Sequence, residues 1–382
     1  MMSAAAFLVL SGWLYLICGR GAFWLSRVAD SAEAAEPPLW PRVAAVVPAR
    51  DEAECIKESV GSLLTQKYPG AFTVTLVDDD SGDATADIAR GVAQGVGRPL
   101  SIVMGRALPA GWTGKMWALK QGIAAAEQSP NPPDYLLLTD ADIVHAADTV
   151  AWLVARAELH GFVLTSLMAQ LRCETLAERV HVPAFIFFFQ MLYPFAWVNR
   201  AELATAAAAG GCMLVRTDAL RAAGGVESIR DALIDDCTLA RVLKARGPVW
   251  LGLTRRVRSI RPNPSWTDFR RMVARSAYAQ LRYSPLLLLA TILGMGVTFL
   301  APPLLALFAS GLPQWLGIAA WALMALAFQP TLCFYGLSPL WGVALPAIAF
   351  LYMVYTVDSA IQYASGRGGR WKGRIQANVS AQ

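Results

Sequence analysis

The apolar residues of this 382-residue chain form long blocks near its two ends. Residues Ala4–Leu25 make up the first block. Three more follow residue 282, at about Pro285–Ser310, Trp315–Tyr335 and Leu340–Tyr363. A helix that crosses a membrane needs about 20 residues. The pattern therefore predicts transmembrane helices at both ends, as an anchor over residues 1–28 and a membrane region over residues 283–365.

Basic residues predict how these helices are oriented. None precedes the first apolar block, whereas Arg20, Arg27 and Arg42 lie late in it or after it. We therefore expect an uncleaved anchor, with its N-terminus outside and the following residues in the cytoplasm. The tail, residues 366–382, also carries basic residues that favour the cytoplasm. These are Arg367, Arg370, Lys372 and Arg374.

The number of C-terminal crossings conflicts with this orientation. Three crossings from a cytoplasmic domain would place the basic tail outside. One stretch must then re-enter the membrane, lie in the interface or be split in two, and Pro302-Pro303 is a candidate break.

The middle of the chain, residues 42–282, has a different pattern and follows a short linker over residues 30–41. Short apolar runs typical of buried strands alternate there with helical patterns. The runs are Val43–Val47, Phe72–Val77, Ser101–Met104 and Tyr135–Thr139. This alternation predicts an α/β domain with a mostly parallel sheet. Ligands bind such sheets at the carboxyl ends of the strands.

One run inside this domain, Pro183–Val198, is apolar and aromatic. It is short for a membrane span and is interrupted by Gln190 and Pro194. Two interpretations stay open: a buried core helix, or a helix lying in the membrane interface beside the site.

Acidic residues end two of the predicted strands. Asp78, Asp79 and Asp80 follow one strand, and Asp140 and Asp142 follow another. Positions i and i+2 at a strand end point to the same side, so the last two carboxylates would repel each other unless a cation lay between them. Carboxylate oxygens suit Mg²⁺ or Mn²⁺, which can bridge to a diphosphate. Turn formation is the simpler explanation of each cluster taken alone.

A second acidic pair, Asp235-Asp236, comes at the head of a helical pattern. Acidic residues suit a helix N-terminus. Alternatively, one of the two is a general base, because a carboxylate in a partly dry cleft has a raised pKa and can take a proton from an acceptor hydroxyl. Upstream, Gly210-Gly211 allows close backbone approach to a ligand or simply makes a turn.

Basic residues allow two interpretations as well. Lys115, after the sequence Gly-Trp-Thr-Gly, either contacts phosphate or is a solvated surface lysine. Eight arginines precede the membrane region and form either a face towards anionic lipid or a partner for a leaving diphosphate. They are Arg255, Arg256, Arg258, Arg261, Arg270, Arg271, Arg275 and Arg282.

Composition agrees with a membrane protein. Apolar residues make up 55% and charged residues 16%, against roughly 45–50% and about 25% in soluble domains. The net charge of +5 is too small to argue for nucleic acid, and we expect no nucleic-acid partner.

Five motifs in this order resemble family 2 glycosyltransferases, which are inverting enzymes with a GT-A fold. They are PARDE (Pro48–Glu52), VDDDSGD (Val77–Asp83), TDAD (Thr139–Asp142), the paired glycines within Gly210–Gly225, and Asp235-Asp236. The anchor, the GWTGK sequence, QLRYSP (Gln280–Pro285), the C-terminal spans and WKGR (Trp371–Arg374) also make the chain similar to hopene-associated glycosyltransferases, a subgroup similar to ceramide glucosyltransferases.

The resemblance implies a role for each motif. Pro48, Arg50 and Glu52 would line the nucleotide pocket. Asp79 would contact uridine, with Asp78 and Asp80 nearby. Asp140 and Asp142 would bind Mg²⁺ or Mn²⁺ with the sugar diphosphate. Asp236 matches the catalytic base, and Asp235 replaces the family's usual Glu, so the choice between the two stays open. The other expected donor-site residues are Lys115, Gly211, Arg275, Gln280 and Arg282.

The resemblance also implies a reaction. A lipid hydroxyl would attack the anomeric carbon of a nucleotide sugar, with UDP as the expected nucleotide, at the cytoplasmic face of the inner membrane. The acceptor would be a hopanoid or another polyisoprenoid or ceramide-like lipid. Processive members carry QxxRW, whereas Gln280 and Arg282 are one residue closer here and Tyr283 replaces Trp. We therefore expect a single transfer; a processive polysaccharide synthase and an inactive membrane scaffold are the alternatives.

Overall fold

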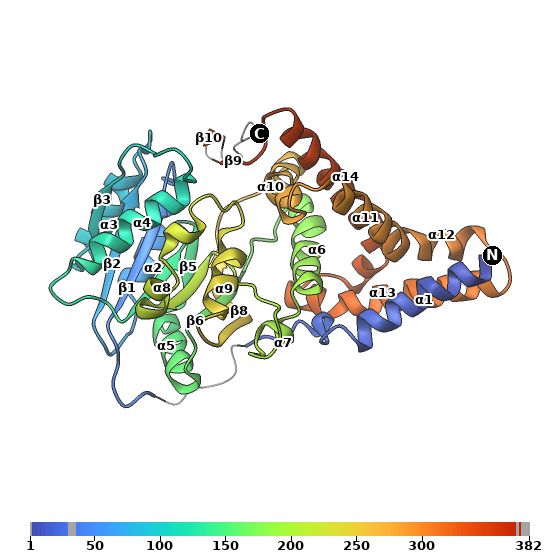
Figure 1. Ribbon diagram of the computed structural model, residues 1–382, viewed down its shortest axis with the longest axis horizontal. Coiled ribbons are helices and arrows are strands. Elements are labelled where there is room, and N and C mark those ends of the chain that lie inside the picture. Colours follow the sequence, from blue (N-terminus) through green and yellow to red (C-terminus); the bar gives the residue numbers. More distant parts are fainter. Residues whose placement is uncertain (1, 30–35, 372–373, 376–382) are drawn as a thin grey trace.

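The computed structural model describes residues 2–29, 36–371 and 374–375. It has two parts (Figure 1): a domain built on a large β-sheet and a group of apolar helices. Residues 30–35 of the predicted linker and Lys372 of the tail lie outside the described residues.

The large sheet has eight strands in the order β3-β2-β1-β4-β7-β6-β8-β5. The strands are β1 (Val43–Ala49), β2 (Phe72–Asp78), β3 (Ser101–Met104), β4 (Tyr135–Thr139), β5 (Ile143–His145), β6 (Leu164–Gln170), β7 (Cys212–Arg216) and β8 (Val249–Ser259). The first four in this order are parallel neighbours, and β6 is parallel to β8. β7 is antiparallel to β4 and β6, and β5 is antiparallel to β8. The predicted α/β fold with a mostly parallel sheet is confirmed.

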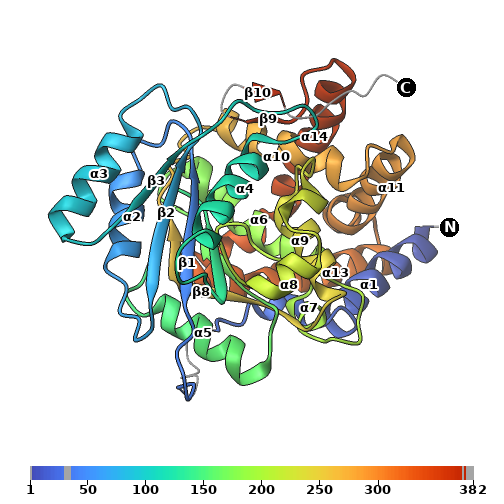
Figure 2. The ribbon, with the colours of Figure 1, turned by 60° about the vertical axis from the view of Figure 1, so that its left-hand side comes forward.

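Helices cover both faces of this sheet (Figure 2). One face packs against α2 (Ile56–Leu64), α3 (Thr85–Val96) and α5 (Thr149–His160), and the other against α4 (Gly114–Glu127), α8 (Thr217–Ala222) and α9 (Asp235–Lys244). Successive residues of a strand point to opposite faces, so Val43, Ala45 and Val47 enter one core and Ala44 and Val46 the other. Burial on both faces explains why β1 is apolar throughout.

The predicted end of the first strand is wrong by two residues. The run predicted at Val43–Val47 continues in β1 through Pro48, opposite Val77 of β2, to Ala49. Proline lacks only the N–H group, so it is tolerated where that group has no ladder partner. The pairing of β1 with β4 has already ended at Val46. The strands predicted at Ser101–Met104 and Tyr135–Thr139 are confirmed as written.

The apolar blocks form helices. Among the described residues, four helical stretches are long and apolar enough to cross a membrane: Leu176–Val198, Pro285–Phe308, Leu312–Phe334 and Leu345–Ala364. They contain α6 (Leu176–Leu192) with α7 (Phe195–Val198), α11 (Pro285–Met295) with α12 (Ala301–Phe308), α13 (Leu312–Phe334) and α14 (Leu345–Ala364). The N-terminal helix α1 (Met2–Cys18) is shorter, with 17 residues.

The candidate break at Pro302-Pro303 takes an unexpected form. The helix is not interrupted there; instead, a π-helical turn over Gly296–Leu300 joins α11 to α12 directly before the two prolines. A proline has no N–H and its ring crowds the carbonyl of residue i−4. A widened turn at that place accommodates both effects.

The aromatic run at Pro183–Val198 forms the core of the junction between the two parts. Phe187 packs against Phe23 and Phe328, with ring centroids 5.3 and 5.2 Å apart. Phe188 lies 5.0 Å from Tyr352 of α14. Both phenylalanines are buried. Of the two interpretations left open by the sequence, the structure favours the buried core helix.

The arginine-rich segment, residues 255–282, covers the end of β8, a loop, α10 (Trp266–Gln280) and the turn after it, and α10 packs along α14. Arg270 donates two hydrogen bonds to Asp358, at 2.9 and 2.7 Å. The turn after α10 brings Tyr283 onto Tyr363, with ring centroids 4.3 Å apart. The short strands β9 (Arg370–Trp371) and β10 (Arg374–Ile375) pair antiparallel in the tail.

Candidate active site

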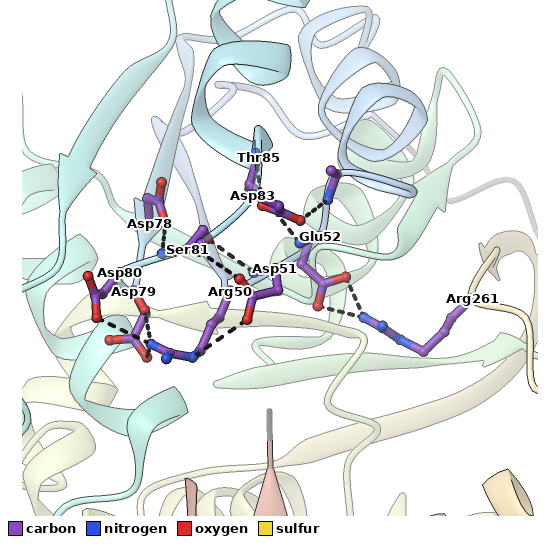
Figure 3. Close-up of polar contacts among 12 residues, drawn as sticks. Arg50, Asp51, Glu52, Asp78, Asp79, Asp80, Ser81, Asp83, Thr85 and Arg261 are labelled. Atoms are coloured by element: carbon purple, nitrogen blue, oxygen red, sulfur yellow. Dashed lines mark hydrogen bonds and ion pairs between the residues drawn. The ribbon is translucent and has the colours of Figure 1, made fainter. Parts of the chain in front are cut away.

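Two loops at the carboxyl ends of β1 and β2 hold the first acidic cluster (Figure 3). Ala49 lies opposite Asp78 in the sheet, so the residues that follow are neighbours. Arg50 Nη1 donates to the carbonyl oxygen of Asp79 at 2.5 Å and lies 3.9 Å from the carboxylates of Asp79 and Asp80. Asp79 is 1% exposed and Asp80 83% exposed. The structure thus brings the predicted nucleotide-pocket residues together.

Hydrogen bonds lock these two loops into one unit. Asp51 Oδ1 accepts from the Gly82 amide at 2.8 Å, and the Asp51 amide donates to Ser81 Oγ at 3.1 Å. The Glu52 amide donates to Thr85 Oγ1 at 2.8 Å. Asp51 and Asp80 adopt left-handed backbone conformations, with φ of 51° and 60°. Aspartate tolerates this conformation better than most residues.

A lysine joins the acidic residues after β4 to the acidic pair at the head of α9. Lys115 Nζ lies 2.8 Å from Asp140 Oδ1, after β4, and 3.0 Å from Asp235 Oδ2, in the first turn of α9. Lys115 itself lies in the first turn of α4, where the helix dipole disfavours a cation. The two carboxylates compensate for that location, and they raise the pKa of Lys115 against the opposing effect of burial.

Asp236 is held beside this ion pair by backbone groups. Its Oδ2 accepts from the Gly210 amide at 2.9 Å and its Oδ1 from the Cys237 amide at 2.7 Å. Burial raises the pKa of Asp236 to about 6, and the neighbouring charge of Asp235 adds to the effect. A Cβ atom on Gly210 would lie 3.2 Å from Lys115 Nζ and 3.4 Å from Asp236 Oδ2. Glycine at 210 therefore lets the loop approach both groups.

Asp140 and Asp142, called the DxD pair below, have separate cationic partners. Asp140 contacts Lys115, whereas Asp142 Oδ2 accepts from Arg261 Nε at 3.1 Å and from Ser259 Oγ at 2.9 Å. Lys115 and Arg261 thus offset the mutual repulsion of the two carboxylates before any metal ion binds. Burial raises the pKa of Asp140, and Lys115 opposes this rise.

These residues still fit a divalent metal that arrives with its ligand. Among the described residues, no group of three His, Cys, Asp or Glu side chains is placed to hold a metal ion. Mg²⁺ is commonly held by one or two carboxylates together with substrate phosphates. Asp140 Oδ2 and Asp142 Oδ1 accept no hydrogen bond from the described part of the chain. Two carboxylates, each with one such oxygen, match that mode of binding.

Glu52 is tied to the same region. Arg261 Nη2 lies 2.6 Å from both of its carboxylate oxygens (Figure 3). Gly211 lies behind the DxD pair, where its carbonyl accepts from Thr139 Oγ1 at 2.7 Å. A Cβ atom on Gly211 would lie 2.9 Å from Ile143 Cδ1, so packing also explains this glycine.

The predicted residues near the membrane region are not all brought to this cluster. Gln280 Nε2 donates to the Tyr193 hydroxyl at 2.5 Å. Tyr193 caps the end of α6, so this hydrogen bond ties the end of α10 to the end of α6. Arg275 and Arg282 are exposed and form no ion pair with any described residue. Arg282 and Tyr283 both have positive φ, 51° and 55°, a strained turn of the kind often found at functional sites.

Sequence reasoning missed three residues of the site. Arg261 was one of eight arginines without a distinguishing pattern, and Ser259 and Tyr193 gave no signal. Their roles depend on strand β8 passing beside β5 and on α6 passing beside α10. Neither pairing can be read from local periodicity.

The family described as Glycosyltransferase like family 2 matches residues 41–279. The fold and the carboxylate cluster define a glycosyltransferase with a GT-A domain. The chain belongs to glycosyltransferase family 2. A comparison with curated proteins gave no match.

Three solved structures are similar to this chain to different degrees. The mannosyltransferase PcManGT from Pyrobaculum calidifontis, in complex with GDP-Man and Mn²⁺, is 20% identical, with a TM-score of 0.55 over 95% of this chain and 99% of that one. Glucosyl-3-phosphoglycerate synthase of M. tuberculosis is 18% identical, with a TM-score of 0.39 over 63% and 80%. TarS 1-349 of S. aureus, in complex with UDP, is 16% identical, with a TM-score of 0.40 over 89% and 98%. The first likeness shows the GT-A fold, and it extends over most of the helical part.

Proposed function

We propose that this chain is a membrane-bound, inverting glycosyltransferase that moves one sugar from a nucleotide sugar, with UDP as the expected nucleotide, to a lipid hydroxyl. One observation carries the proposal. Lys115 lies between Asp140 of the DxD pair and Asp235 of the Asp-Asp pair, at 2.8 and 3.0 Å. The groups proposed to bind the donor and the groups proposed to activate the acceptor therefore face one site.

Asp236 is the better candidate for the base. Asp235 is already paired with Lys115, whereas the pKa of Asp236 is raised to about 6 by burial. A base with a pKa near the working pH is ionised and still takes a proton effectively. Its two backbone hydrogen bonds fix the carboxylate towards Gly210.

The donor would occupy the edge formed by the loops after β1, β2 and β4. Asp79, buried beside Arg50, is proposed for the uridine, and Asp140 and Asp142 would hold Mg²⁺ or Mn²⁺ with the diphosphate. A bound metal would supply positive charge to the leaving diphosphate. Arg275 and Arg282, which form no ion pair with a described residue, are proposed to add to it.

A lipid acceptor is supported by the position of the apolar helices. α6 connects the catalytic domain to α13 and α14, and the hydrogen bond between Gln280 and Tyr193 ties α10 to the end of α6. Large apolar side chains are exposed on the helices, among them Leu286, Leu304, Phe308 and Trp315. A hopanoid or a similar polyisoprenoid or ceramide-like lipid, at the cytoplasmic face of the inner membrane, is the proposed acceptor.

A nucleotide-sugar screen on detergent-purified protein tests the proposal. UDP release would be followed with and without Mn²⁺, with total membrane lipid as acceptor, for the wild type, Asp142→Ala and the surface control Asp218→Ala. We expect release from one donor that needs metal, increases with lipid and is lost only in Asp142→Ala. Nucleotide binding without release would contradict the acceptor assignment. Absence of nucleotide binding would contradict the transferase itself.

A further inference from the structure

Arg261 bridges two motifs that are far apart in the sequence. It lies between β8 and α10, and its guanidinium contacts Glu52, after β1, and Asp142, after β4. The side chain of Arg261 is 35% exposed, while Glu52 is 6% and Asp142 13% exposed. Because β1 and β4 are neighbouring strands, one side chain connects the proposed nucleotide pocket to the proposed metal pair.

The backbone on both sides of this arginine is anchored. The Ile260 amide donates to the carbonyl oxygen of Asp142 at 2.9 Å, and the Asn263 amide donates to Glu178 Oε1 at 3.0 Å. The first contact fixes the segment to the DxD loop, and the second fixes it to the start of α6. The guanidinium is therefore presented from a segment with little freedom, which suits the rigid fork geometry of arginine.

We infer that Arg261 is a positioning residue of the donor site, holding Glu52 and Asp142 in the arrangement that receives the nucleotide diphosphate and its metal. This inference rests on the proposed function. Two poorly solvated carboxylates at neighbouring strand ends repel each other and turn apart without a shared cation. Arg261 neutralises both and engages only Oδ2 of Asp142, so that Oδ1 accepts no hydrogen bond from the described residues.

The chain offers a matched control for this arginine. Arg42 forms the same kind of two-point contact with Asp134, at 3.1 and 3.0 Å, and it ties the opposite ends of the same two strands. That pair is exposed and lies away from the proposed site. Arg42→Gln therefore removes an equivalent ion pair without touching the donor edge.

The test is calorimetric titration of purified full-length protein with UDP and with Mn²⁺ in the presence of UDP. We expect Arg261→Gln to raise both dissociation constants about tenfold or more, as the loss of a charge-assisted contact predicts. Arg42→Gln should stay within twofold of the wild type. In the lipid-stimulated assay, the KM for the donor should rise more than kcat falls, because Arg261 does not touch the reacting atoms.

The conservative variant separates positioning from bulk stability. Arg261→Lys keeps the charge but loses the fork, so its binding should fall between that of the wild type and that of Arg261→Gln. A folded Arg261→Gln that binds UDP and Mn²⁺ like the wild type overturns the inference. If Arg261→Gln does not fold, Arg261→Lys decides: weaker binding supports the inference, and wild-type binding overturns it. A wild type that binds no nucleotide contradicts the proposed function instead.

Discussion

Lys115 and Arg261 neutralise the carboxylates of the site from different elements. Lys115 lies at the start of α4, against the helix dipole, and Arg261 lies beyond the sheet in the segment before α10. Each contacts one member of the DxD pair and one carboxylate from another motif. The four acidic groups are thereby kept close together before any ligand binds.

The raised pKa of Asp236 predicts an acidic limit to catalysis. A base works only when ionised, so the rate should rise with pH through about 6 and level off roughly one unit higher. Asp236→Asn should lower kcat by about 10²–10⁴-fold and remove this limb. The measurement is the pH dependence of lipid-stimulated UDP release, with Asp218→Asn as the surface control. An unchanged acidic limb in Asp236→Asn would assign the proton transfer to another group.

Replacement of Lys115 should destabilise the domain. Lys115→Met leaves Asp140 and Asp235 without their cation, which for a fully buried pair costs about 3–5 kcal/mol. Asp140 is 35% exposed, so we expect about 2 kcal/mol after allowance for solvent screening. Chemical denaturation in detergent measures it. Lys120→Met on the same helix, where Lys120 pairs with exposed Glu227, should cost less than about 1 kcal/mol. Equal losses would contradict the special role of Lys115.

Among single residues, the carboxylates of the cluster were easier to predict from the sequence than the side chains that contact them. Asp140, Asp235 and Asp236 could be found because acidic residues at strand and helix ends form recognisable local patterns. Arg261 could not, since its role depends on where β8 lies in the sheet. The position of Gln280 depends likewise on α10 docking against α6.

Helix α4 owes its close approach to the sheet to one glycine. A Cβ on Gly122 would lie 2.7 Å from Val77 Cγ2 and closer still to Val46 Cγ1. Both valines are fully buried in β2 and β1. The strands that carry the nucleotide loops are thus packed directly on the helix that carries Lys115.

Alanine at position 122 should therefore be destabilising despite its higher helix propensity. Overpacking of a dense core costs about 1–3 kcal/mol, and a shift of α4 would also displace Lys115. Gly91 of α3 is the control, because nothing lies within 4 Å of its Cβ position. Gly91→Ala should increase stability by about 0.5–1 kcal/mol. Thermal unfolding of the two variants measures both effects. A change in stability of the same sign in both variants would contradict the packing argument.

Element prediction succeeded for β1 to β4, which lie side by side as parallel neighbours, and failed for β5 to β8. β1 to β4 are continuous apolar runs with helical patterns between them. β5 has three residues, and β8 carries charged residues such as Arg255 and Arg256 in its second half. Such strands are stabilised by their neighbours in the sheet, and their local sequence gives little signal.

The arrangement of the helices bears on the conflict between three crossings and a basic tail. α1, α12 and α13 extend together away from the sheet domain (Figure 1). Gln314 Nε2 donates to Ala306 at the far turn between α12 and α13, at 3.2 Å. α13 then returns to the domain, where the Tyr335 hydroxyl accepts from the Leu171 amide at 3.4 Å. The stretch Pro285–Phe308 (α11 and α12) and α13 therefore form a hairpin that starts after α10 and returns to the domain.

α14 follows a different path. It begins beside the middle of α13, since Trp321 Nε1 donates to the Val343 carbonyl at 3.2 Å. It ends where Tyr363 stacks on Tyr283, at the start of α11. Between these points it packs along α10 and α6 of the junction. We therefore predict that α14 makes no third crossing and that the basic tail lies on the same side of the membrane as the catalytic domain.

Single-cysteine labelling tests this topology without depending on activity. The six native cysteines would be replaced, and exposed serines would be changed one at a time. The three variants are Ser310→Cys in the α12–α13 turn, Ser365→Cys after α14, and Ser129→Cys on the catalytic domain. A membrane-impermeant maleimide on sealed, oriented vesicles should label positions 365 and 129 from one side and position 310 from the other. Labelling of positions 365 and 310 from the same side would show that α14 crosses the bilayer. The basic tail would then lie opposite the catalytic domain, against the positive-inside preference of its arginines.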